Sequence, residues 1–279
     1  MKHRFQRLSG RTIFYLAVIL AVVVVVFPSY WLFVTALQEE KYQLVYPPYL
    51  TPQIFNWHSF VSLFEATPML RWLRNSVLVS LGVTVLALVM SILGAYSLSG
   101  FRFRGRGTFV FLLLVSQMMP QALLVVPIFV LFRQFGLLNS LQGLVLVDTA
   151  FVVPVTVWVM KGFFDSIPRE ILEAALMDGC SRMSVLFRIL LPLSLPAIVA
   201  VCVVAFFDGW NEYLFAVTFV SSSENWVATI GLAGFIGELA TPLELMMAAA
   251  AVFSIAPVIF YLLMQRYIVS GLTGGAVKG

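Results

Sequence analysis

The sequence predicts an all-α protein that crosses a membrane several times, and three observations support this fold class. The chain of 279 residues is 61% hydrophobic and only 11% charged, whereas an ordinary soluble domain is about 25% charged. Its apolar residues form long runs, as the spans of a polytopic membrane protein do. Its basic residues gather in the short segments between those runs.

Six runs are long enough to form transmembrane helices, since a helix needs about 20 mostly apolar residues to cross the bilayer. The first run has a basic start and an apolar core, as a signal peptide does. It is too long for one, and no small-residue cleavage pattern follows Phe27-Pro28, so we expect a retained span. The predicted spans are 13–36, 72–98, 108–132, 142–161, 194–220 and 243–268.

The positions of Lys and Arg predict that both termini lie in the cytoplasm. If the N-terminus is inside, only four of the 17 basic residues fall in outer loops, namely Lys41, Arg71, Arg74 and Arg133. The rest lie on the cytoplasmic side: Lys2, Arg4, Arg7, Arg11, Arg102, Arg104, Arg106, Lys161, Arg169, Arg182, Arg188, Arg266 and Lys278. These basic clusters flank spans, so the net charge of +4 does not indicate nucleic-acid binding.

The longest outer loop, 37–71, is rich in proline and aromatic residues. Such a composition suits an irregular segment in the headgroup zone, with a short helix within 53–66. Whether this loop is an interfacial anchor or a surface for a partner stays open.

The short charged segment 162–192 predicts two small helices joined by a tight turn. Asp165 and Ser166 precede Pro168, which is the order expected at a helix start. The helix should end at Gly179, because glycine takes the left-handed cap conformation without strain. Ser181 can then cap a second helix that ends before Pro192.

Polar residues inside the predicted spans mark candidate pathway or gate positions, because a charge in the bilayer must face a pore or find partners. Asp208, Asn211 and Glu212 lie close together on one face of the span predicted at 194–220. A gate or pathway lining and hydrogen bonds between helices are both open interpretations, and direct substrate contact is a third and less favoured one.

The span predicted at 108–132 carries Gln117 and Gln121, two further pathway candidates. Interior prolines remove backbone hydrogen bonds and bend helices, so we expect bends in this span and in two others. These prolines are Pro120, Pro127, Pro154 and Pro257.

Several functions are not supported by the sequence. The two cysteines, Cys180 and Cys202, give no disulfide framework, and His3 and His58 lie outside the spans, so we expect no metal site. No phosphate-binding G-x-x-x-x-G-K-[ST] motif is present, and no nucleophile is paired with a base. We therefore expect a chain that is not an enzyme and binds no cofactor of its own.

The segment 173–192, EAALMDGCSRMSVLFRILLP, resembles the cytoplasmic EAA loop of importer permeases of the ATP-binding-cassette class. The resemblance covers roughly 70–279. It includes Asp208-Gly-Trp-Asn-Glu-Tyr213 and the ending from Gln265 to Gly279, both similar to the maltose-type carbohydrate permease that lacks a large outer domain.

This resemblance implies a type I importer permease fold, divided into 1–70 (N-terminus, first span and outer loop), a permease core at 71–268 and a cytoplasmic tail at 269–279. It implies an ATP-driven importer of a sugar, oligosaccharide or polyol in a bacterial or archaeal cytoplasmic membrane. The implied partners are two ATPase subunits that hold ATP and Mg²⁺, a second permease that supplies most sugar contacts, an extracytoplasmic solute-binding protein and the membrane lipid around the spans.

The resemblance also implies roles for individual residues. In the coupling loop, the ATPase contacts would be Glu173, Ala174, Ala175, Asp178 and Gly179. A second docking element would be the tail residues Gly271, Thr273, Gly274 and Gly275. The alternative to the whole assignment is an ion-coupled secondary carrier with Asp208 and Glu212 as its relay. Internal repeats would favour this alternative, and the sequence shows none. A scaffold without a pore is a third, weaker interpretation. The particular substrate is not predicted.

Overall fold

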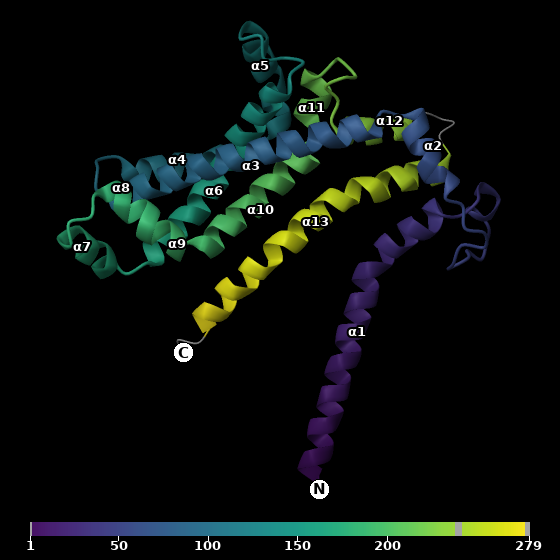
Figure 1. The fold of residues 1–279 in the computed structure, drawn as a ribbon, viewed down its shortest axis with the longest axis horizontal. Coiled ribbons are helices and arrows are strands. Elements are labelled where there is room, and N and C mark those ends of the chain that lie inside the picture. The colour runs from purple at the N-terminus through teal and green to yellow at the C-terminus, as the bar shows by residue number, and fades with distance from the viewer. Residues whose placement is uncertain (1, 238–241, 277–279) are drawn as a thin grey trace. The chain divides into compact units, whose positions relative to one another are not determined.

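The computed structural model describes residues 2–237 and 242–276, with side chains described for 13–236 and 242–267, and in these ranges it is helical apart from loops and one isolated β-bridge (Figure 1). The chain divides into two compact units. One consists of the chain up to Met69 together with Leu232–Ser254, and the other of Leu70–Gly231 together with the chain from Ile255 onward.

The first unit contains α1 (Lys2–Ala36), the short 3₁₀ turn η1 (Glu40–Tyr42) and α2 (His58–Ala66). Its outer loop is irregular but internally bonded. Gln38 pairs with Phe55 in an isolated antiparallel bridge, and the Asn56 amide donates to the Leu37 carbonyl at 2.8 Å. Gln43 Nε2 donates to Glu244 at 2.8 Å, which ties the loop to the first turn of α13 (Leu243–Ala276). The short helix expected within 53–66 is present as α2.

The second unit is a bundle in which α10 packs on α6 and α4 also lies against α6 (Figure 1). A compact coupling segment and two shorter helices, α5 and α11, are attached to it. The helices not yet bounded are α3 (Met69–Gly100), α4 (Arg106–Ser116), α5 (Gln121–Gln134), α6 (Leu141–Ser166), α7 (Arg169–Met177), α8 (Arg182–Val185), the π-helical turn η2 (Leu186–Leu190), α9 (Leu191–Leu193), α10 (Leu195–Asn211), α11 (Leu214–Phe219) and α12 (Ala228–Gly237).

By length and composition, four described helical stretches are able to cross a membrane: Ile13–Ala36, Met69–Gly100, Leu141–Ser166 and Leu243–Tyr267. Two sharply bent pairs raise the number to six if each pair is one span. Arg106–Ser116 meets Gln121–Gln134 at 101°, and Arg182–Leu193 meets Leu195–Asn211 at 79°. The all-α, multi-span fold class is thereby confirmed.

Two predicted spans are broken rather than continuous. The span expected at 108–132 breaks between Ser116 and Gln121, where Pro120 has an extended backbone. The span expected at 194–220 ends at Asn211, and a separate helix starts at Leu214. Among the prolines expected to bend spans, Pro120 lies at a break, whereas Pro127, Pro154 and Pro257 remain inside continuous helices.

Close helix packing in the second unit depends on small side chains, as is usual for helices in membranes. Gly209 of α10 faces Val83 and the backbone of Ser80 on α3. Ser91 of α3 donates to the Thr156 hydroxyl of α6 at 2.7 Å. A contact of a different kind joins α10 to α13, where the rings of Phe206 and Phe260 stack with centroids 3.8 Å apart and planes 6° apart.

We expect Gly209→Leu to lower the free energy of unfolding in detergent by about 1–3 kcal/mol, and with it the unfolding temperature, because overpacking forces neighbouring side chains and backbone apart. A Cβ at this position would already lie 3.2 Å from Val83 Cγ2 and 3.3 Å from Ser80 Cα. Gly162→Leu is the matched control, since a Cβ there meets no atom within 4 Å. Equal unfolding temperatures for the two variants would contradict this packing.

Candidate functional site

The predicted coupling loop, 162–192, contains two short helical stretches joined by a tight turn, as its sequence predicts. Gly179 has φ +86°, and its amide donates to the Leu176 carbonyl at 3.1 Å. The Cys180 amide donates to the Ala175 carbonyl at 3.0 Å, which completes the two-bond cap that ends many helices. Ser181 Oγ then accepts from the Ser184 amide at 3.2 Å and so caps α8. The end at Gly179 and the cap at Ser181 are confirmed. The predicted end before Pro192 is wrong, because the helical stretch continues through Pro192 to Leu193.

The predicted coupling residues differ in exposure. Glu173, Ala174, Asp178 and Gly179 are exposed, and Met177 next to them is 88% exposed. Ala175 is only 6% exposed, because it lies on the face of α7 that packs against the chain itself. Its side chain therefore supports α7 from within and is not available as a direct docking contact.

The second half of the loop is embedded in the bundle. Leu186 and Leu190, which are 0% and 2% exposed, belong to one apolar cluster with Met160 and Phe164 of α6 and Val201 of α10. A buried apolar side chain of this size contributes about 1.5–3 kcal/mol. The coupling loop is thus continuous with the core that holds α6 and α10.

Polar contacts add to this anchoring. Tyr96 of α3 donates its hydroxyl to the Arg182 carbonyl at 2.9 Å, and the Arg182 guanidinium lies 4.8 Å from the Phe101 ring centroid. Asp165 forms ion pairs with Lys161, four residues earlier on α6, and with Arg106 at 3.8 Å. The α3–α4 connection is therefore tied to the start of the coupling loop.

The break after α10 is stabilised by Glu212. Its Oε1 accepts from the Phe215 amide at 2.7 Å and its Oε2 from the Ala216 amide at 2.9 Å, so this carboxylate satisfies the first free amides of α11. Sequence spacing predicts that Glu212 shares a face of one helix with Asp208. The structure corrects this, because the backbone of Glu212 is extended and its side chain turns to the next helix.

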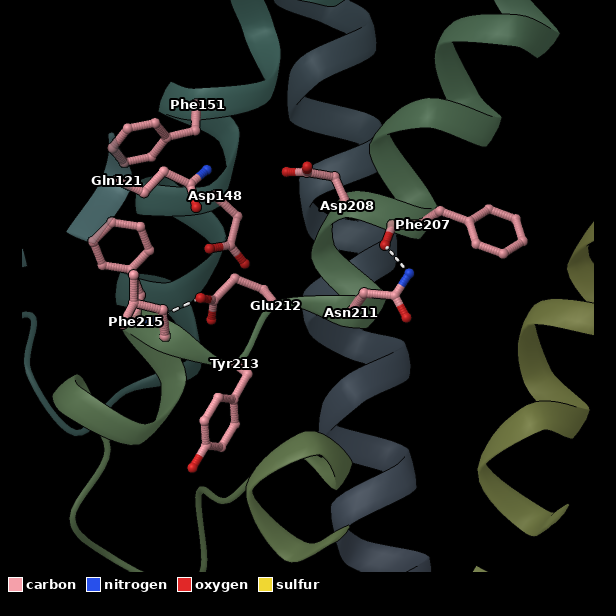
Figure 2. Close-up of a pocket in the computed structure, with 10 residues that line it drawn as sticks. Gln121, Asp148, Phe151, Phe207, Asp208, Asn211, Glu212, Tyr213 and Phe215 are labelled. Carbon is pink, nitrogen blue, oxygen red and sulfur yellow. Dashed lines mark hydrogen bonds between the residues drawn. The ribbon is translucent and has the colours of Figure 1, made fainter. Parts of the chain in front are cut away.

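A cavity of about 570 Å³ opens beside this break (Figure 2). It is lined by Gln121, Asp148, Phe151, Phe207, Asp208, Asn211, Glu212, Tyr213, Leu214 and Phe215. Four of the five predicted pathway residues line it. The exception is Gln117, whose Nε2 donates to the carbonyl of Phe151 at 2.8 Å on the neighbouring helix α6. The side chain of Asn211 turns back on α10, where its Nδ2 donates to the Phe207 carbonyl at 2.9 Å.

Asp148 of α6 also lines the cavity, and it is not among the residues predicted from the sequence. It is 2% exposed, and neither carboxylate oxygen has a hydrogen-bond partner among the described residues. Figure 2 shows Asp148, Asp208 and Glu212 reaching into the same space from α6, from α10 and from the segment after it. One signal was available, since an ionisable residue within the apolar run 142–161 is a candidate functional residue by default.

The remaining predicted residues fall into two groups. In the part of the chain with described side chains, no three His, Cys, Asp or Glu residues are grouped to hold a metal ion. The tail positions Gly271, Thr273, Gly274 and Gly275 continue the backbone of α13, and their side chains lie outside the described residues. Their docking role stays a prediction.

Comparison with known proteins gives a family match over most of the chain. Residues 84–274 match the family model described as "Binding-protein-dependent transport system inner membrane component". The chain is 36% identical over 276 residues to the inner membrane ABC transporter permease protein YcjP of Escherichia coli, covering 98% of this chain and 99% of that protein. It is 32% identical over 283 residues to the trehalose/maltose transport system permease protein MalG of Thermococcus litoralis, covering 98% and 99%.

The fold also matches that of a solved structure. A chain in the crystal structure of a bacterial ABC transporter involved in the import of the acidic polysaccharide alginate aligns with a TM-score of 0.80. The alignment covers 94% of this chain and 96% of that one, at 22% sequence identity. At this identity the likeness shows the fold.

We expect Glu212→Ala to speed hydrogen exchange at the Phe215 and Ala216 amides about fivefold or more, because losing a helix cap costs about 1 kcal/mol. Glu212→Gln keeps one acceptor oxygen and should have a smaller effect. Asp208→Ala is the control, since Asp208 lines the same cavity without bonding to α11. If the control accelerated exchange at these amides as much as Glu212→Ala does, the capping role would be wrong.

Proposed function

The chain belongs to the family of binding-protein-dependent transport system inner membrane components, and we propose that it carries a carbohydrate through the inner membrane as one permease subunit of an ATP-binding-cassette importer. A multi-pass permease of this kind has no catalytic domain of its own. Family membership also sets aside the ion-coupled secondary carrier that Asp208 and Glu212 left open.

The carbohydrate cargo is supported by the names of relatives and by the cavity. Relatives at 32% identity are described as transporting trehalose and maltose or diacetylchitobiose. The cavity combines acceptor side chains with aromatic ones, as binding sites for hydroxyl-rich molecules do. The particular sugar or polyol differs among relatives and is not part of the proposal.

The coupling loop is the surface on which a separate ATPase acts. The single observation that carries this role is the exposed first helix, α7, with its Gly179 cap, joined to a second half that is buried in the bundle core. Glu173, Ala174, Asp178 and Gly179 face the ATPase. A ligand moves an equilibrium only through its different affinity for two states, so the ATP-bound ATPase must favour one orientation of this loop.

The complete assembly contains two ATPase subunits, a second permease and an extracytoplasmic binding protein that delivers the cargo. Both termini and the coupling loop lie in the cytoplasm, as the Lys and Arg distribution predicts. The outer loop between α1 and α2 faces the binding protein or the headgroups. The tail after Tyr267 reaches toward the ATPases.

We expect Glu173→Lys and Gly179→Asp each to abolish uptake while the protein still inserts into the membrane. Charge reversal removes the docking contact. A side chain at Gly179 both strains a backbone with φ +86° and enlarges the docking surface. The measurements are uptake of a labelled oligosaccharide mixture by cells that produce the complete importer, and co-purification of the ATPase subunit.

Glu65→Lys is the matched control, because it makes the same charge reversal on exposed α2, which is expected on the other side of the membrane. It should retain the ATPase. A further test places cysteine at Ala174 in a Cys180→Ser, Cys202→Ser background. Failure of this cysteine to cross-link to the ATPase, or normal uptake in Glu173→Lys, would refute the docking role.

A further inference from the structure

Within the described chain, the cavity beside α10 is lined by acidic residues and by no basic ones. Three carboxylates, from Asp148, Asp208 and Glu212, face it, and the described residues that line it include no Lys, Arg or His. Both carboxylate oxygens of Glu212 already accept hydrogen bonds from amides of α11. Asp148 and Asp208 therefore supply the acceptor oxygens that remain for a ligand.

Asp148 is the residue that points to a ligand most directly. Its side chain is 2% exposed, and both oxygens lack a partner in the described chain. A buried polar group without a hydrogen-bond partner destabilises a fold. Among the residues with described side chains, Asp148, Asp208 and Glu212 do not lie close enough together to form a metal site. Hydroxyl or amine donors of a bound organic molecule would satisfy these oxygens.

Aromatic rings stand next to these acceptors. Phe151 and Phe215 stack with centroids 5.2 Å apart, and Tyr213, which is 44% exposed, also lines the cavity. In Figure 2 the rings of Phe151 and Phe215 lie on one side of the carboxylates, whereas Tyr213 and Phe207 extend away from them. An apolar face beside strong acceptors matches a sugar ring, which has apolar C–H faces and hydroxyl donors at its edge.

We propose that this cavity is a saccharide subsite in this subunit, in which Asp148 and Asp208 accept hydrogen bonds from sugar hydroxyls. Its acidic lining favours neutral or amino-bearing sugars and disfavours anionic ones. The site rests on the proposed transport function and deepens it, because the family resemblance assigns most sugar contacts to the partner permease. An anionic sugar would meet like charges at short range, in a setting where they are weakly screened.

The charge of the site is tested with a cysteine probe. Gln121 lines the cavity and is exposed, so Gln121→Cys is made in the Cys180→Ser, Cys202→Ser background of the assembled importer, purified in detergent. Reaction rates are measured with a cationic and an anionic methanethiosulfonate. The cationic-to-anionic ratio should exceed that of Gln53→Cys, an exposed loop control, by about tenfold.

Neutralising Asp148 should bring this ratio back toward the control. Asp148→Asn keeps the size of the side chain and removes its charge, whereas Glu224→Gln removes a charge from an exposed position outside the cavity and should leave the ratio unchanged. A ratio equal to that of the loop control, or no reaction with either reagent, would overturn the proposal.

The ligand class is tested by protection. Glucose, glucosamine and glucuronate, at equal concentration, are added before the reagent. Glucose and glucosamine should slow modification of Gln121→Cys, and glucuronate should not. Equal protection by glucuronate, or protection by none of the three sugars, would overturn the subsite. If the ATPase still co-purifies in that case, the permease assignment stands and the subsite alone fails.

Discussion

Helix ends inside a membrane are destabilising, because backbone groups without partners cannot form hydrogen bonds with water there. The break between α10 and α11 meets this constraint with one side chain. Glu212 accepts the first free amides of α11, and its own carbonyl accepts from the Thr229 hydroxyl at 2.7 Å. Because these bonds make the interruption tolerable, a cavity can open there, with Asp208 on one side of the break and Phe215 on the other.

Most of the architecture could be predicted from local patterns. Apolar runs gave the spans, and Gly179 with Ser181 gave the two ends of the coupling turn, since caps depend on a few neighbouring residues. The cavity could not be predicted in the same way. Glu212 was expected to continue a helix because spacing alone does not show where a span breaks. Asp148 carries one local signal, an ionisable side chain within an apolar run. Its grouping with Asp208 and Glu212 depends on other parts of the chain, and no local period reveals it.

The coupling loop also shows which part of a motif is surface and which part is support. Ala175 belongs to the E-A-A triplet, yet it is buried, whereas Glu173 and Ala174 are exposed. Leu186 and Leu190 then anchor the following turn among α6 and α10. Since packed interiors resist compression, a displacement of this turn would move α6 and α10 with it.

The parallel rings of Phe206 and Phe260 have a mechanical consequence for α13. Two flat faces have no interlocking shape, so they can glide over one another and keep much of their dispersion contact. Gly209, which lies on α10 as Phe206 does, packs closely against Val83 of α3, and that contact resists sliding. α10 therefore has two different contacts. The flat ring contact with α13 offers little resistance to sliding, whereas the close contact with α3 opposes it.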